Sequence, residues 1–262
     1  MDMNASAIAR TASKVPAVTL GFWAIKILAT TLGETGGDTL SMTYDLGYLV
    51  SSAIFVVPLI LLVAAQIRAR GFHPALYWAT IIASTTAGTT IADFATRSMG
   101  IGYTGGSALL LALVLLSLAV WHRTMGTISV ERIASPKAEA FYWTTITFSQ
   151  TLGTALGDWA ADDGGLGYLG GALLFGGVLG VLALLWFATS TNKVALFWAA
   201  FILTRPLGAT VGDFLDKPLA KGGLDFSRPV ASAVLVVAIV VLIWLIPQRA
   251  GSHPSNATGR MQ

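Results

Sequence analysis

Four aspartates recur at nearly equal steps along the chain, and they are the residues whose type and spacing point most directly to chemistry. Each lies five residues after a glycine and fifteen after a tryptophan, and successive aspartates are 55, 65 and 55 residues apart. They are Asp38, Asp93, Asp158 and Asp213. Carboxylate oxygens bind hard cations such as Mg²⁺, Mn²⁺ or Ca²⁺, and they also take up protons. The repeat therefore predicts a set of four carboxylates as candidate metal ligands.

Each aspartate directly follows the second of two small residues that are four positions apart. Such pairs let helix backbones approach closely in lipid. The pairs are Gly33 and Gly37, Gly88 and Ala92, Gly153 and Gly157, and Gly208 and Gly212. We therefore expect a close helix crossing beside every carboxylate.

Stepping back by four residues from each aspartate stays near one face of a helix and defines three further layers. The layer next to the aspartates is Glu34, Thr89, Thr154 and Ala209, the next is Thr30, Thr85, Gln150 and Arg205, and the innermost is Lys26, Ile81, Ile146 and Phe201. Polarity rises towards the aspartates. The stripe therefore predicts a cation pathway. Carboxylate, hydroxyl and amide oxygens of the aspartate layer and of the two layers next to it would line this pathway.

Two other interpretations of the aspartates stay open. An aspartate can simply end a helix beside a hydrated loop. A ring of like charges also needs positive charge among its members, which a bound cation, shared protons or nearby Arg and Lys side chains would supply.

Three ionisable residues, Lys26, Glu34 and Arg205, lie deeper and occur in one repeat each. Charges at such depth are costly and usually functional. If the four repeats close into a ring, repeats 1 and 4 become neighbours and Arg205 can pair with Glu34. That pair is either a structural ion pair or a gate and proton-coupling switch, and Pro206 should kink its helix.

The composition indicates a membrane protein. The chain has 262 residues, 55% of them hydrophobic and 11% charged, against about 25% charged in soluble domains. The absence of cysteine excludes disulfides and thiolate sites. The basic isoelectric point of about 9.3 follows from basic loops on one membrane side, so we expect no nucleic-acid partner.

The elements that position the aspartates are helices. Each motif helix begins with an aromatic residue and a tryptophan, and a second apolar run follows, near 49–66, 105–121, 169–188 and 229–247. Each run approaches the ~20 residues that cross a bilayer. We predict an all-α polytopic membrane protein with about eight transmembrane helices. It is built from four parallel helical-hairpin repeats around a pseudo-four-fold axis.

The predicted boundaries follow from these runs. They are an N-terminal segment 1–13, repeat 1 at 14–67, repeat 2 at 68–121, a linker 122–137, repeat 3 at 138–188, repeat 4 at 189–247 and a disordered tail 248–262, all within one membrane domain.

The four tryptophans and the GETGGD-type boxes resemble a family of bacterial integral membrane proteins with a four-fold tandem repeat of unknown function. The resemblance covers roughly 14–247. It implies two membrane segments and one tryptophan per repeat, and it supplies no activity.

Basic residues set the orientation. Ten lie on the side that holds both termini and four on the aspartate side, which places both termini in the cytoplasm of a bacterial inner membrane. The motif tryptophans then lie at the cytoplasmic interface, where they form an aromatic belt or pack between repeats. They are Trp23, Trp78, Trp143 and Trp198.

The leading functional hypothesis is transport of a cation, Mn²⁺ or Mg²⁺ before others, or of a proton-coupled ion. Lys26 and Arg205 argue against free conduction. The alternatives are a proton-coupled transporter of a small organic solute, whose carboxylate or phosphate these two residues would hold, and a membrane scaffold or sensor. No hydrolase, metalloprotease or nucleotide-binding motif is present, so we expect no enzyme and no cofactor beyond a bound divalent cation. The partners expected are lipid and the solute, with homo-oligomerisation left open.

Overall fold

A computed structural model describes residues 13–133 and 135–251, so most of the predicted N-terminal segment and tail lies outside the described residues. Eight α-helices make up this part of the chain. They are α1 Leu20–Asp38, α2 Gly47–Arg68, α3 Pro74–Asp93, α4 Gly102–Met125, α5 Pro136–Asp158, α6 Gly167–Ala188, α7 Lys193–Asp216 and α8 Arg228–Leu245. Five short helical turns join them, namely η1 Thr39–Thr43, η2 Phe94–Ser98, η3 Val130–Arg132, η4 Trp159–Asp163 and η5 Leu219–Lys221.

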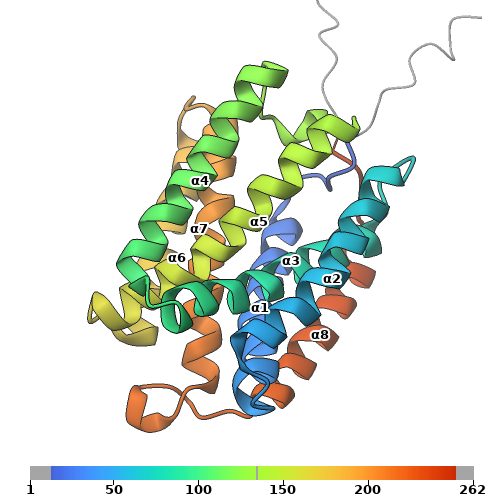
Figure 1. Cartoon of the computed structure of the whole chain (residues 1–262). Helices are drawn as coiled ribbons and strands as arrows, with labels where there is room; N and C mark the ends of the chain where they lie inside the picture. Colours follow the sequence, from blue (N-terminus) through green and yellow to red (C-terminus); the bar gives the residue numbers. More distant parts are fainter. Residues whose placement is uncertain (1–12, 134, 252–262) are drawn as a thin grey trace, which may run out of the picture.

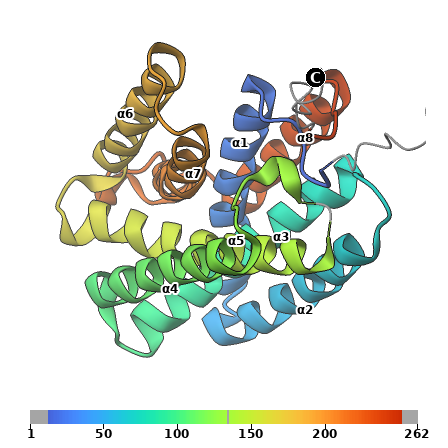
Figure 2. The same ribbon diagram turned by 90° about the horizontal axis from the view of Figure 1, so that it is seen from above.

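The motif helices α1, α3, α5 and α7 form a closed inner ring. Each packs on the next, and α7 packs back on α1. Figure 2 shows the four around the middle, with the second helices α2, α4, α6 and α8 outside them. The predicted ring of four helical repeats is therefore present.

The outer helices interlock neighbouring repeats. Each packs mainly on the motif helix of the following repeat: α2 on α3, α4 on α5, α6 on α7, and α8 on α1. The repeat is a helical hairpin in sequence, but its second helix lies against its neighbour's first. Every repeat thus holds the next one in place, and α8 closes the ring (Figure 1).

The outer surface is suited to lipid. Five helices, α2, α4, α6, α7 and α8, are long and apolar enough to cross a membrane. The four outer helices are only 11–22% buried over their apolar windows, and large apolar side chains such as Leu173 and Val237 are exposed along them. The motif helices α1, α3 and α5 owe their lower hydropathy to the polar stripe, which the ring encloses. A contiguous apolar exterior of this size indicates a membrane protein.

The two described ends of the chain meet at one end of the ring, opposite the aspartates. The amide of Ser13 donates to the carbonyl of Gly251 over 3.1 Å, and the amide of Ala17 donates to that of Arg249 over 2.8 Å. The amide of Lys14 donates to the carbonyl of Ile133 over 2.8 Å. We call this end the terminal end, and the opposite one the acidic end.

The predicted linker is partly structured. Helix α4 continues to Met125, four residues into the expected linker. Val130 and Ile133 are then buried beneath the terminal end of the ring. Burial of these apolar side chains explains why the segment is not a free loop.

The aromatic-belt interpretation of the tryptophans is wrong for three of the four. Trp78, Trp143 and Trp198 are 1–4% exposed, and Trp23 is half-buried. The indole of Trp198 donates to the carbonyl of Ile128 over 2.9 Å. The indole of Trp78 donates to Gln248 Oε1 over 3.1 Å. The three buried rings therefore pack between repeats and not at the lipid interface.

Candidate functional site

The polar stripe forms the centre of the ring. All sixteen positions of the four predicted layers are buried, at 0–2% exposure. Stepping by four residues therefore identified the inner face of every motif helix. The side chains of four repeats meet in stacked layers around one axis.

Small residues hold the motif helices close together at these layers. A side chain at Gly88 would meet the backbone of Gln150 and Thr151 at 2.9 Å, and one at Gly212 would meet Cβ of Glu34 at 2.7 Å. The first glycine of each pair faces a residue of the next repeat, and these four residues form the layer that contains Thr30. These contacts join Gly33 to Thr85, Gly88 to Gln150, Gly153 to Arg205 and Gly208 to Thr30. The close helix crossings predicted from the small-residue pairs are present.

Two basic side chains bridge the four aspartates in pairs. Arg97 contacts Asp93 through Nε at 2.9 Å and Asp158 through Nη2 at 3.0 Å. Lys217 Nζ lies 2.8 Å from both Asp38 Oδ2 and Asp213 Oδ1. The positive charge that the ring requires is thus supplied by the protein. One bridge joins repeats 2 and 3, and the other joins repeats 4 and 1.

The bridging residues belong to a fifth layer, four residues beyond the aspartates. Its members are Met42, Arg97, Asp162 and Lys217, one from each repeat. They lie on η1, η2, η4 and the end of α7. In the first three repeats the helix widens here into a π-helical turn, a feature common at functional sites. One more step of four along the sequence would have found this layer.

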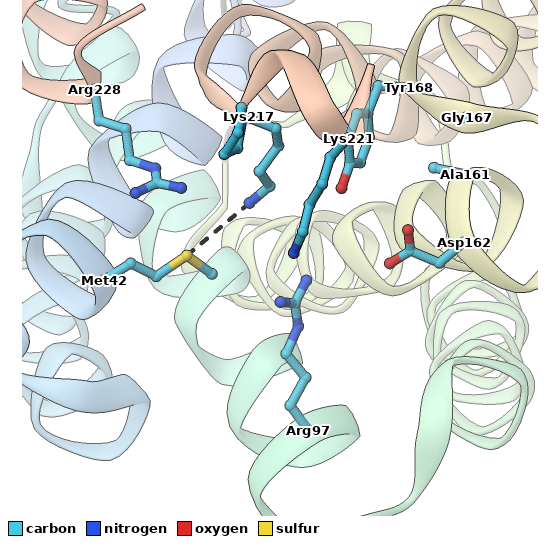
Figure 3. Close-up of a pocket in the computed structure, with 10 residues that line it drawn as sticks. Met42, Arg97, Ala161, Asp162, Gly167, Tyr168, Lys217, Lys221 and Arg228 are labelled. Atoms are coloured by element: carbon cyan, nitrogen blue, oxygen red, sulfur yellow. Dashed lines mark hydrogen bonds between the residues drawn. The ribbon is translucent and has the colours of Figure 1, made fainter. Parts of the chain in front are cut away.

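These four residues line a pocket of about 540 Å³ at the acidic end. Lys221, Arg228 and Tyr168 complete most of its wall. Figure 3 shows Arg97, Lys217 and Lys221 pointing into the same space, with Asp162 opposite. All four basic residues that the sequence places on this side of the membrane therefore gather around one opening.

Neighbouring charges control the two bridging side chains. Burial by itself would lower the pKa of Lys217, but the carboxylates of Asp213, Asp38 and Asp216 outweigh it and raise the pKa above its ordinary value. Burial opposes the charge of Arg97 in the same way, and Asp93 and Asp158 raise its pKa. Both side chains stay cationic while the carboxylates are ionised.

Below the aspartates, Arg205 pairs with Glu34 as ring closure predicted. Its Nη1 and Nη2 donate to Glu34 Oε2 over 3.1 and 3.0 Å. The same Nη2 reaches Thr89 and Thr154 on the other two motif helices, α3 and α5, each at 2.5 Å. Arg205 is fully buried. Its hydrogen bonds link its own repeat to the other three.

The terminal end of the axis is closed by an aromatic cap. Its residues are Phe22, Tyr77, Trp78, Tyr142, Trp143, Phe197, Trp198 and Phe201. Ring contacts of 5.5–6.4 Å run around the full circle, from Phe22 to Trp78, Tyr77 to Trp143, Tyr142 to Trp198, and Phe197 to Phe22. The polar column therefore has a pocket at one end and an apolar seal at the other.

The arrangement changes the metal hypothesis. Among the described residues, the carboxylate group close enough to share an ion is Glu34, Asp38 and Asp213, whose oxygens lie within 4.8 Å of one another. Asp93 and Asp158 belong to the other bridge and are not part of it. Because Lys217 contacts two of the three carboxylates and Arg205 the third, a metal ion would have to displace both cations.

The chain matches a known repeat family. A family model described as a Repeat of Unknown Function (DUF347) matches the chain four times, over residues 21–72, 76–127, 141–192 and 196–250. Each range covers most of one motif helix and all of the outer helix that follows it. No curated protein and no solved structure matches the chain.

Proposed function

Since the chain belongs to this family of four-fold repeats, whose name gives no activity, we propose from its geometry that it is a proton-coupled membrane transporter of a small polar solute. The observation that carries the proposal is the axial column of buried polar side chains, open to a pocket at the acidic end and sealed by the aromatic cap at the terminal end. Packing of helices against one another in lipid does not require such a column. Ionisable groups inside a membrane are costly and usually functional.

The column resembles the solute path of a membrane carrier in a conformation that is open on one side only. A solute in the pocket meets the two carboxylate bridges, then the Arg205–Glu34 pair, and finally the cap. Alternating access requires the bridges and the pair to yield in turn. With the positive-inside orientation, the pocket faces the periplasm and the cap faces the cytoplasm.

The positions of the bridges suggest where the ring opens. They hold α3 to α5 and α7 to α1, and the other two interfaces carry no bridge in the aspartate layer. The ring then divides into two halves. In the column they share neutral contacts and the hydrogen bonds that Thr89 and Thr154 make with Arg205 and Glu34, and at the terminal end the Lys14–Glu139 pair also joins them. Rocking of one half against the other would open a path at those two interfaces.

Arg205 and Glu34 are suited to couple this movement to protons. Arg205 belongs to one half, and its bonds to Thr89 and Thr154 reach the other. Proton binding to Glu34 would remove the charge that fixes the guanidinium and release the tie between the halves. Pro206 leaves α7 without a backbone hydrogen bond beside Arg205, which eases bending there.

A divalent cation remains the second candidate, carried by the close approach of Glu34, Asp38 and Asp213. The geometry favours the organic solute because six basic residues lie along the column and its pocket. They are Lys26, Arg97, Arg205, Lys217, Lys221 and Arg228.

Reconstitution into liposomes with an internal pH dye tests the proposal. A panel of small acids, amines, Mn²⁺ and Mg²⁺ would be presented to wild type, to Glu34→Gln and to the exposed control Asp45→Asn. Solute-dependent proton movement in wild type and Asp45→Asn, lost in Glu34→Gln, is expected. Metal flux without proton movement would move the assignment to cation transport. No flux of any kind in folded wild type, with either direction of gradient, would refute transport.

A further inference from the structure

The two innermost layers of the column contain buried polar groups that have no hydrogen-bond partner among the described residues. These are Lys26 Nζ, Thr85 Oγ1, Gln150 Nε2 and Oε1, and Arg205 Nε. All four residues are 0% exposed, and each comes from a different repeat. Buried polar atoms of this kind are normally paired. Four residues with such atoms around one axis indicate a place that a ligand or water fills.

Lys26 differs from the other buried lysines of this protein. Lys14 donates to Glu139 and to two backbone carbonyls, and Lys217 contacts two carboxylates. The ammonium of Lys26 lies 3.9 Å from the centroid of the Phe201 ring, with no hydrogen-bond acceptor among the described residues. A lysine kept for structure alone would be expected to find acceptors as the other two do.

Two basic side chains and no carboxylate belong to the two innermost layers. The layer of Lys26 is completed by Ile81, Ile146 and Phe201, and the layer above holds Arg205 without any carboxylate. The nearest acid on the stripe, Glu34, is engaged by Arg205. An added negative charge would be attracted by Arg205 and would stabilise the ammonium form of Lys26, whereas an added cation would be repelled.

The donor set matches an oxyanion. We propose that the two inner layers bind the carboxylate or phosphate group of the transported solute. Lys26 Nζ and Arg205 Nε would supply charge-assisted hydrogen bonds, and Gln150 Nε2 and Thr85 Oγ1 neutral ones. The pocket at the acidic end would admit such solutes past the basic side chains that line it. This inference rests on the proposed function for its meaning in transport, but binding itself is measured without transport.

The test is thermal unfolding of the purified protein in lipid nanodiscs, titrated with sodium acetate, succinate or phosphate against sodium chloride at equal ionic strength. Saturable stabilisation reports binding to the folded state. We expect it for at least one oxyanion, weakened at least ~10-fold in Lys26→Met. The matched control Lys137→Met removes an exposed lysine at the start of α5, at the terminal end and away from the pocket and the column, and it should bind within about two-fold of wild type. Comparison of phosphate with the carboxylates names the group that is preferred.

Removal of an unpartnered amine leaves no other group unsatisfied, so Lys26→Met should fold. If it does not, Gln150→Leu serves in its place and should also weaken binding. The proposal is overturned if no oxyanion binds saturably to folded wild type, if Lys26→Met or its substitute binds as wild type does, or if Lys137→Met alone loses binding. Oxyanion binding without flux in liposomes supports this site while refuting the transporter. Metal flux without oxyanion binding refutes this site and moves the proposed function to cation transport.

Discussion

Removal of either member of the Arg205–Glu34 pair should destabilise the protein far more than removal of both. In Arg205→Leu, Glu34 keeps only the hydroxyls of Thr89 and Thr154. In Glu34→Leu, a guanidinium that is 0% exposed loses its one carboxylate partner. Breaking a buried pair in this way costs about 3–5 kcal/mol, whereas replacing both members by apolar groups is often near neutral.

The double variant Glu34→Leu/Arg205→Leu should therefore be no less stable than either single variant, which gives a coupling energy of at least about 3 kcal/mol. Equilibrium unfolding in mixed micelles containing SDS, followed by tryptophan fluorescence, measures it. The chain offers a control at the terminal end, where Lys14 pairs with Glu139 at 2.6 Å. Lys14→Leu combined with Glu34→Leu should be additive within roughly 0.5 kcal/mol because the two sites share no partner.

Additive single effects at Glu34 and Arg205 would contradict this reasoning. They would mean that each side chain finds solvent or another partner when the other is lost. In that case the pair is not the tie between the halves of the ring, and the proposed proton switch fails with it.

Three further predictions test the packing and the electrostatics. Gly88→Ala should cost about 1–3 kcal/mol of stability because the added Cβ meets backbone atoms at 2.9 Å. Its control Gly177→Ala, where an added Cβ meets nothing within 4 Å, should be neutral or slightly stabilising. Equal effects of the two substitutions would contradict the close helix crossing. Trp198→Phe should lose roughly 1–3 kcal/mol with its hydrogen bond to Ile128, and Trp244→Phe, whose side chain is 83% exposed, should change little in the same unfolding assay. The raised pKa of Lys217 makes its contribution fully present below the ordinary value of 10.5 and lost as pH rises through the folded-state value. Lys217→Met should therefore melt below wild type at neutral pH and approach it only in strong alkali, and a difference that vanished already near pH 8 would show that the bridge does not form.

Several features of this protein followed from the sequence alone. The recurrence of Trp, Gly and Asp identified the four repeats, and the first glycine of each pair contacts the motif helix of the next repeat all round the ring. Steps of four residues identified the inner face of each motif helix, because that spacing follows from helix geometry alone. Ring closure even indicated the partner of Arg205, since a closed ring makes repeat 4 the neighbour of repeat 1.

Other features depended on tertiary packing. The tryptophans are equally suited by type to a lipid interface and to a helix–helix core, and only the packing at the terminal end places Trp78 and Trp198 inside. Pairing of α2 with α3 depends on which groove an outer helix enters after its turn, and no local pattern encodes that choice.

The aspartates show the same division most clearly. Their type and period predicted a ring of carboxylates, which a metal ion, protons or basic side chains can each neutralise. The choice depends on where Arg97 and Lys217 reach, and therefore on the distance between neighbouring helices. The sequence determined that negative charge gathers at one end of the axis, and only the tertiary structure decided that two basic side chains hold it in pairs.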